Sequence, residues 1–303
     1  MIKKILLSLT SALALALIIG YATLIAPSYT PSAACDYMLD VTRLRDLASS
    51  LPGDKPKEIR VEHVTSVSLP NALVSVGQPW TSVQLRVYAY QLVFGDKTII
   101  VETAMNFAQA RHIHMADGYD STAWGRVLKA MGNASAIYVT HEHADHLGGA
   151  VAVPDAPYLA KVHLNPEQLK GGTPSEPEMS PATRGALTAL PYEGMVAVAP
   201  GVVLIRAPGH TAGSQMIYLQ RADGVEVLLT GDSALLMESI ESGQGPIRLA
   251  SVIGHGDQHA IACQLVELKR LRQRDSSIAI MPGHDGARMQ VLVARHVFVP
   301  RFL

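Results

Sequence analysis

The sequence predicts a mixed α/β fold, and three observations carry that prediction. Strand-like apolar runs occur in succession, helix-like segments separate them, and polar motifs follow directly where several of the runs stop. Of the 303 residues, 48% are hydrophobic and 17% are charged, so the chain can bury a large core and wholesale disorder is excluded. The length allows one large domain or two small ones.

The N-terminus carries the pattern of an export leader. Two lysines precede an apolar run, residues 5–26, which is long enough to span a bilayer, for which about 20 residues suffice. Small residues before Cys35 offer a cleavage site and also look like the end of a bacterial lipobox. We expect residues 1–35 to be a signal peptide or membrane anchor; a cleaved signal, an uncleaved anchor and a lipoprotein all stay open. In each case the domain would be exported, and it would be either free in the periplasm or held by a membrane anchor and facing the periplasm.

The remaining elements follow in order along the chain. Residues 36–57, punctuated by prolines and a glycine, are expected to be a linker, and residues 58–303 are expected to form the folded domain. Strands are predicted at residues 58–63, 84–93, 98–101, 136–140, 202–206, 215–219, 225–230 and 277–281. Helices are predicted at residues 124–131, 258–274 and 285–294. Two stretches rich in turn-forming residues are predicted loops, residues 104–121 and 171–181.

Charge and cysteine content exclude several classes of function. The net charge of −1 argues against a nucleic-acid partner, which requires clustered positive charge. Two cysteines, Cys35 and Cys263, can form one pair at most, so neither a disulfide scaffold nor a cysteine-based zinc cluster is expected. Cys263 falls within the predicted helix at 258–274, where we expect it to pack in the core.

Histidine and aspartate gather in four short motifs, each directly after an apolar run. The first motif is HEHADH at residues 141–146, and the later ones carry His210, Asp232 and His284. Three imidazoles and a carboxylate within one short segment are costly to bury unless they bind a metal. Because each motif stands at the end of a strand, one rigid scaffold can direct all of these side chains to one point.

These motifs resemble those of the metallo-β-lactamase superfamily, and the resemblance covers roughly residues 58–303. The H-x-H-x-D-H motif of that family matches residues 141–146, and its later ligands match His210, Asp232 and His284. The resemblance implies a four-layer αβ/βα sandwich with two metals at one edge. It also implies a division of ligands: His141, His143 and His210 on one metal; Asp145, His146 and His284 on the other; Asp232 bridging.

Such ligands suit two divalent metal ions, zinc first, with iron or manganese as alternatives. Two adjacent cations would lower the pKa of a bridging water until hydroxide exists near neutral pH, and that hydroxide would attack an electrophilic carbonyl. Asp145 and Asp232 are therefore expected to be catalytic as well as metal-binding. Ser214 lacks the G-x-S-x-G surroundings of a nucleophile and is expected to be structural.

The choice of activity rests on the resemblance. Classical β-lactamases of the family generally lack the bridging aspartate, and the segment after His284 is too short for the extension of glyoxalase II-type thioesterases. The motifs look like the group that contains the N-acyl-homoserine lactonases, although Leu235 stands where lactonases often have tyrosine. We expect a hydrolase that opens a lactone or other carboxylic ester in a small molecule. A β-lactamase, a thioesterase of the same fold and a non-catalytic metal-binding protein are the alternatives; the native metal and oligomeric state stay open.

Two expectations concern the surroundings of the metals. Glu102 stands where the family often has an aspartate that supports a ligand histidine, so it is either such an acceptor or a solvated side chain. The two predicted loops are expected to form an apolar rim that favours a neutral acyl or alkyl chain, unless their side chains pack beneath the loops. The rim residues would be Met105, Phe107, Met115, Tyr119, Met179 and nearby Tyr192.

Overall fold

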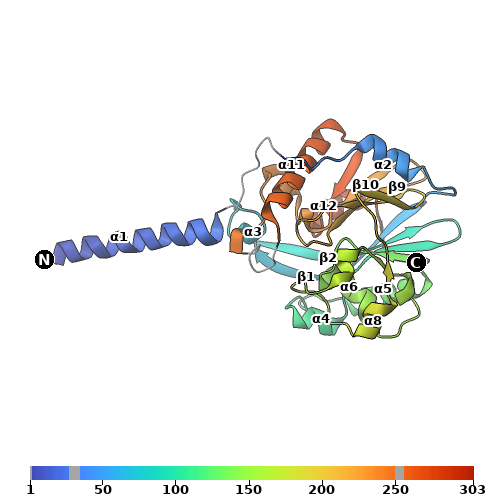
Figure 1. Ribbon diagram of the computed structural model, residues 1–303, viewed down its shortest axis with the longest axis horizontal. Coiled ribbons are helices and arrows are strands. Elements are labelled where there is room, and N and C mark those ends of the chain that lie inside the picture. The colour runs from blue at the N-terminus through green and yellow to red at the C-terminus, as the bar shows by residue number, and fades with distance from the viewer. Residues whose placement is uncertain (1, 27–34, 250–255) are drawn as a thin grey trace.

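The computed structural model describes residues 2–26, 35–249 and 256–303. Two five-stranded sheets lie face to face, and helices cover the outer side of each (Figure 1). This confirms the expected αβ/βα sandwich.

The first sheet has the strand order β12-β1-β2-β3-β4. Its strands are β1 (Glu58–Pro70), β2 (Ser82–Val93), β3 (Thr98–Thr103), β4 (Ala136–Tyr138) and β12 (Val299–Pro300). The strands β1 and β2 pair antiparallel along their whole length, β3 continues antiparallel to β2, and β4 joins β3 in parallel. The predicted strands are confirmed, and this long pairing carries β1 beyond the end that its sequence pattern indicated.

The second sheet has the order β11-β10-β9-β8-β7. Its strands are β7 (Met195–Ala199), β8 (Val202–Arg206), β9 (Gln215–Gln220), β10 (Glu226–Leu229) and β11 (Ile278–Met281). The strands β7 to β10 run antiparallel in succession, whereas β11 joins β10 in parallel. The strand β7 was not predicted; it lies at the sheet edge and most of its residues are only half-buried.

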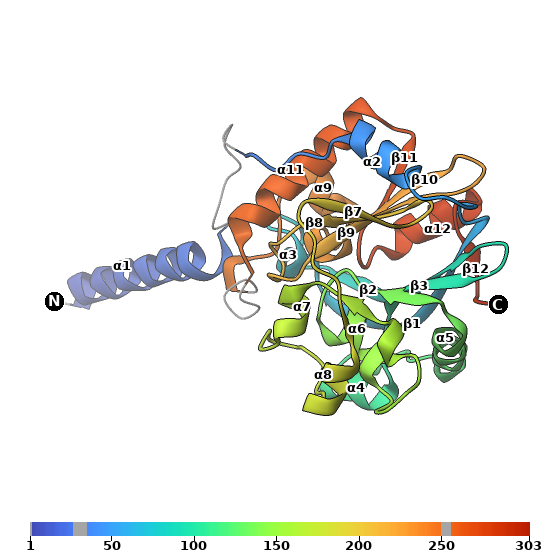
Figure 2. The same cartoon turned by 45° about the vertical axis from the view of Figure 1, so that its right-hand side comes forward.

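Helices and short elements complete the body. Five of the described helices lie near the first sheet (Figure 2): α4 (Phe107–His112), α5 (Ser121–Asn133), α6 (Ala144–Val151), α7 (Pro166–Lys170) and α8 (Pro181–Ala186). The same part of the chain contains the 3-10 turn η2 (Leu159–Lys161) and a two-stranded pair, β5 (His163–Leu164) and β6 (Thr188–Ala189). With the second sheet and at the sandwich ends are α2 (Val41–Ala48), α3 (Asn71–Val74), η3 (Gly231–Ser233), α9 (Met237–Ser242), α11 (Gln258–Arg274) and α12 (Gly286–Ala294). The helix α4 occupies part of the stretch predicted as the first loop.

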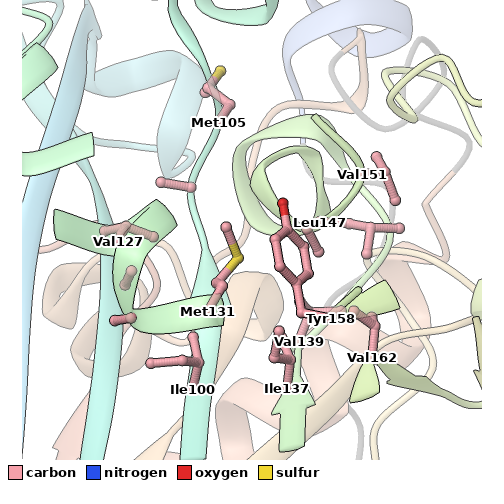
Figure 3. Close-up of a cluster of buried hydrophobic side chains, with 14 of the residues drawn as sticks. Ile100, Met105, Val127, Met131, Ile137, Val139, Leu147, Val151, Tyr158 and Val162 are labelled. Carbon is pink, nitrogen blue, oxygen red and sulfur yellow. The ribbon is translucent and has the colours of Figure 1, made fainter. Parts of the chain in front are cut away.

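Among the described residues, three large apolar cores hold these layers together, and a small fourth cluster around Val74, Leu85 and Leu236 lies apart from them. The central core joins inward-facing residues of both sheets, such as Leu92 and Val101 with Leu204 and Ile217. Outside the first sheet, Figure 3 shows a second core in which β3 and β4 pack against α5, α6 and the following segment. On the outer face of the second sheet, α2 and α11 pack to form the third core, in which Tyr218 is fully buried. One core between the sheets and one on each outer face are what a four-layer sandwich requires.

The N-terminal segment stands apart from this body. The helix α1 (Ile2–Gly20) continues into a π-helical turn, η1 (Tyr21–Ile25), and projects away from the sandwich in both ribbon views (Figures 1 and 2). Large apolar side chains along it are exposed, among them Leu13 and Leu17. Over the residues that are described, no helix meets the length and hydrophobicity that a membrane crossing needs.

The stretch predicted as a linker contributes to the body. Within it, α2 is capped by Asp40, whose side chain accepts a hydrogen bond from the backbone of Arg43, and its residues Leu44 and Ala48 are buried against the second sheet. Cys263 is buried, as expected, but it is not a free thiol, because it forms a disulfide with Cys35 over a Cα–Cα distance of 5.2 Å. This bond fixes the start of the stretch to α11.

Candidate metal centre

The four polar motifs meet at one edge of the sandwich. The first follows β4 and runs into α6, His210 follows β8, Asp232 lies in η3 after β10, and His284 follows β11. The strands end at this edge where their buried apolar runs stop, and the next residues project from fixed backbone positions. All seven residues predicted as ligands are brought together: His141, His143, Asp145, His146, His210, Asp232 and His284.

One half of the cluster consists of three histidines. His143 Nδ1 lies 3.0 Å from His141 Nε2 and 3.0 Å from His210 Nε2. Two nitrogens on one tetrahedral zinc, each about 2.0 Å from the ion, would lie roughly 3.3 Å apart. The observed spacing is close to that value, so these three nitrogens converge as a shared metal site requires.

The other half combines Asp145, His146 and His284. Asp145 Oδ2 lies 3.5 Å from the Nε2 atoms of both His146 and His284. All three side chains are buried, and α6 holds two of them because they are consecutive in its first turn. This half therefore offers two imidazoles and one carboxylate around a second point.

Asp232 lies between the two halves. Its Oδ2 atom is 3.3 Å from His210 Nε2 and 3.9 Å from His141 Nε2, while its Oδ1 atom is 3.1 Å from His284 Nε2. His284 Nε2 also lies 3.3 Å from Oδ2, so the carboxylate as a whole contacts histidines of both halves, which is the position expected of a bridging residue. Gly283 permits the approach, since a Cβ there would overlap Asp232 Oδ1.

Groups behind the cluster orient the ligand histidines. His284 Nδ1 lies 2.9 Å from the carbonyl oxygen of Arg86, and His146 Nδ1 lies 3.1 Å from Glu102 Oε1. Each contact leaves Nε2 facing the cluster, as such supporting bonds do in metal sites. Glu102 is buried, so of its two expected roles it takes the supporting one; it also has a positive φ of 61°, an unusual conformation for a residue with a side chain.

The three-histidine half favours neutral imidazoles. Burial lowers the pKa of His143 to about 4, and burial together with the neighbouring His146 lowers the pKa of His141 well below its usual range. The pKa of His210 is lowered as well, again mainly by burial. Neutral imidazole is the form that binds metals, so these side chains need no deprotonation near neutral pH.

The other half favours positive charge. Burial lowers the pKa of His146, but the carboxylates of Asp145, Glu102 and Asp232 outweigh that effect and raise it well above its usual range. At His284 burial again lowers the pKa, but the Asp232 and Asp145 carboxylates together outweigh it and raise the pKa. A pocket of carboxylates that stabilises protonated histidine is one in which a bound cation would be stabilised too.

Unpartnered buried atoms indicate that the residues fit a metal. Within the described part of the chain, three atoms of these residues have no hydrogen-bond partner: His146 Nε2 and Asp232 Oδ1, which face the cluster, and His143 Nε2, the ring nitrogen opposite the one that faces it. Buried polar atoms in proteins are nearly always satisfied, and the donor set of imidazoles and carboxylates is one that zinc, iron or manganese accepts. The cluster is therefore a group of His/Asp residues suited to divalent metals.

An apolar cavity of about 240 Å³ opens beside the cluster, bordered by His210 and Asp232. His210 is the most exposed of the ligands, with 23% of its side chain accessible. Most of the wall is apolar and comes from the segment between β1 and β2 with its flanking strand residues, from the residues after Asp232 and from α11. Its aliphatic side chains are Leu69, Leu73, Val74, Leu85, Ala234, Leu235, Ile261 and Leu265, and Ser233, Ser239, Gly245, Pro246 and Gly256 complete the lining. Leu235, which stands where lactonases often have tyrosine, is thus part of an apolar wall.

The apolar rim expected on the two loops does not form. Met105 is fully buried, while Met115, Tyr119 and Met179 pack against the core outside the first sheet. Tyr192 packs against the central core, and its hydroxyl donates a hydrogen bond to the Gln215 side chain. Of the six residues, only Phe107 is largely exposed. The alternative reading, in which these side chains pack beneath the loops, is the correct one for most of them.

Two polar residues near the motifs have structural contacts. Ser214 Oγ accepts a hydrogen bond of 2.9 Å from the backbone of Thr211, which supports its expected structural role. Glu142, between His141 and His143, was not singled out from the sequence, yet it is fully buried and accepts hydrogen bonds from two threonines. Its place between two ligands, in a segment with alternating side chains, was the signal available.

Known proteins share this sequence pattern. The family model described as the metallo-beta-lactamase superfamily matches residues 84–284. An N-acyl homoserine lactonase of Bacillus thuringiensis subsp. kurstaki is 25% identical over 180 residues, which is 54% of this chain and 70% of that protein. A probable metallo-hydrolase of Bacillus subtilis (strain 168) is 29% identical over 184 residues, covering 56% of this chain and 70% of the relative.

Solved structures share the fold. An N-acyl homoserine lactone hydrolase with the product N-hexanoyl-L-homoserine at its catalytic metal center has a TM-score of 0.61 at 21% identity, covering 78% of this chain and 96% of its own. A dizinc quorum-quenching lactonase, AidC, has a TM-score of 0.53 at 14% identity, covering 77% and 90%. With its sandwich and its His/Asp cluster, this chain belongs to the metallo-β-lactamase superfamily and is a hydrolase related to the N-acyl homoserine lactonases.

Proposed function

We propose that this protein is a dinuclear metal hydrolase that opens a lactone, or cleaves another neutral carboxylic ester, with an apolar chain on the substrate. The observation that carries the proposal is the apolar cavity beside His210 and Asp232. A substrate whose carbonyl reaches the cluster would have that cavity for its chain. The similarity to lactonases supports the same class of substrate.

The metal ions would be held by the two halves of the cluster, with Asp232 shared between them. Two divalent ions, zinc first and iron or manganese as alternatives, would supply Lewis acidity and lower the pKa of a water molecule toward neutrality. Asp145 and Asp232 would keep their carboxylates ionised, because the neighbouring histidines overcome burial and lower both pKa values. The half-exposed face at His210 would admit the carbonyl.

The chain's own residues would bind and orient the substrate. Leucine side chains such as Leu73 and Leu235 would take the apolar chain out of water, which contributes about 0.8 kcal/mol for each buried methylene. Among the described residues that line this cavity there is no lysine or arginine, so it favours a neutral substrate over a phosphate or other polyanion. Fixing the chain would also fix the carbonyl next to His210.

A metal analysis combined with a substrate panel tests the proposal. The purified protein should hold two metal ions per chain and hydrolyse an acyl lactone or ester much faster than a β-lactam or a thioester of matched chain length. A faster reaction with the β-lactam or the thioester would assign the protein to one of those alternatives. Stoichiometric metal without hydrolysis of any of these substrates would favour a non-catalytic metal-binding protein.

We also propose that the domain is exported through its N-terminal segment, residues 1–35. The exposed apolar side chains of α1 support this, and so does the Cys35–Cys263 disulfide, since disulfides persist mainly in oxidising compartments. A sulfur in that bond is not available for acylation, which disfavours the lipoprotein alternative. A reporter fused after Leu303 should be active only outside the cytoplasm, and strong cytoplasmic reporter activity would overturn the proposal.

A further inference from the structure

Glu142 is a fully buried carboxylate inside the first ligand motif, and its side chain does not join the metal cluster. Its Oε2 atom accepts a hydrogen bond of 2.9 Å from Thr211 Oγ1, and its Oε1 atom accepts one of 2.8 Å from Thr173 Oγ1. A buried carboxylate is tolerated when such donors replace water. These two bonds connect three segments that are far apart in the sequence.

The bond to Thr211 reaches the turn that carries His210. Within this turn, Thr211 also contacts Ser214, with 3.0 Å between the two hydroxyl oxygens, and the backbone of Ala207 donates to the Ser214 carbonyl over 3.0 Å. Gly213 lies directly against Glu142, where a Cβ would overlap Oε2 of the carboxylate. The turn is thus held by its own hydrogen bonds and packs against Glu142. Both residues of the contact are next to predicted ligands in the sequence, since Thr211 follows His210 and Glu142 lies between His141 and His143.

The bond to Thr173 reaches the segment at residues 171–181. A second bond joins the same two regions, because the Ala144 backbone donates to the Ser175 carbonyl over 2.8 Å. Glu176 in this segment pairs with Arg184 at 2.6 Å, which anchors the segment to α8. The first ligand motif is therefore braced from this side at two points.

We propose that Glu142 is a positioning residue that fixes His210 relative to His141 and His143 before any metal binds. Without the carboxylate, the turn at His210 would lose the bond nearest to the ligand, from Thr211 to the segment that carries the other two ligands. The backbone bond from Gln215 to the Thr140 carbonyl, 2.8 Å, would still join the two segments, so we expect a displaced His210 and not an unfolded turn. The ligand nitrogens of His141, His143 and His210 would then be brought into place only when the metal binds. The free energy needed to order them would lower the metal affinity. The inference rests on the proposed metal binding but not on the substrate, so it is tested by affinity rather than by hydrolysis.

The test compares zinc affinities, measured by competition with a chelator of known affinity, and the absorption spectra of the cobalt-substituted proteins. Glu142→Leu should weaken zinc binding about 10- to 100-fold and alter the cobalt spectrum, which is the range for lost supporting bonds at metal ligands. Glu142→Gln should restore most of the affinity, because an amide accepts from one threonine and donates to the hydroxyl of the other.

The two threonines provide a matched comparison. Thr211→Val removes the bond next to His210 and should weaken zinc about tenfold, whereas Thr173→Val should change the affinity less than about threefold. Thr188→Val, which removes a hydroxyl bond to the Ala160 carbonyl outside the cluster, is the control and should change nothing. If Glu142→Leu does not fold, Thr211→Val decides.

The proposal is overturned if folded Glu142→Leu, or Thr211→Val in its place, keeps the wild-type zinc affinity and cobalt spectrum. Wild-type protein that binds no zinc, iron or manganese would instead defeat the proposed function, and this inference with it. Normal metal affinity in the wild type together with no hydrolysis would leave the positioning role standing and remove only the proposed substrate.

Discussion

The two sides of the metal cluster are built differently. On the loop side, residues 104–121 and 171–181 carry methionine and aromatic side chains, and most of these turn inward to the core outside the first sheet. On the cavity side, apolar side chains of β1, β2, α3 and α11 surround an open space beside His210 and Asp232. The two sides have similar residue types and opposite outcomes.

The difference has a physical cause. A loop can adjust its backbone until its apolar side chains leave water, so methionines on loops collapse onto the nearest core. In strands and helices, backbone hydrogen bonds fix the positions from which the side chains project. These side chains therefore cannot all move in to fill the cavity beside His210 and Asp232. Leu85 on β2 and Leu265 on α11 are placed by elements that pack elsewhere, and the cavity between them persists. The substrate pocket is therefore better sought between these regular elements. The loops do enclose a separate cavity of about 630 Å³, but its lining includes none of the seven predicted ligands.

The largest effect is expected where the two sides meet, at Asp232. Because its carboxylate contacts histidines of both halves of the cluster, Asp232→Ala should release metal and abolish hydrolysis together. Metal content by elemental analysis and kcat on the best substrate measure both effects. An inactive variant that still holds two metals per chain would contradict the bridging role.

A smaller, selective effect is expected on the cavity side. Leu73 is a partly buried wall residue of the cavity, so Leu73→Trp should shorten the space for the chain and leave the cluster intact. Losing room for about two methylenes, each about 0.8 kcal/mol, would lower kcat/KM for long-chain substrates roughly tenfold relative to short ones. Leu51→Trp, at a residue 37% exposed in the segment before β1, is the matched control. An equal loss for long and short chains would mean that Leu73 does not contact the chain.

The smallest effect is expected on the loop side. Phe107 is 51% exposed, and its ring contacts Tyr119 edge-on at 5.3 Å. Phe107→Ala should change kcat/KM less than about twofold at every chain length, and surface substitutions of this kind change stability by about 0.5 kcal/mol or less. A marked loss of activity on long chains in this variant would place the substrate on the loops and break the comparison.

The local parts of the site could be predicted from the sequence. Each ligand directly follows an apolar strand, so the motifs at His210, Asp232 and His284 mark both the strand end and the cluster. Glu102 was recognisable for the same reason, at the end of β3. The sandwich followed from the family resemblance that these motifs carry.

The long-range parts could not be predicted. The disulfide joins residues 228 positions apart; with only two cysteines the pair itself was given, but that their backbones come close enough to form the bond is decided by the folded chain. The helix α2 lies in a stretch with several prolines and is stabilised by packing on the second sheet. The cavity combines Leu73, Leu235 and Leu265, whose proximity exists only after folding. The direction of a loop side chain, as at Met105, likewise depends on the core beneath it.

The dependence of kcat/KM on acyl chain length in the wild-type protein tests the central claim most directly. A series of lactones or esters that differ only in the length of a neutral acyl chain would be compared at fixed metal content. The cavity beside His210 predicts a rise of roughly tenfold for every two methylenes, at up to about 0.8 kcal/mol each, until the space is filled. A flat dependence on chain length, or a clear preference for anionic phosphoesters, would contradict the account.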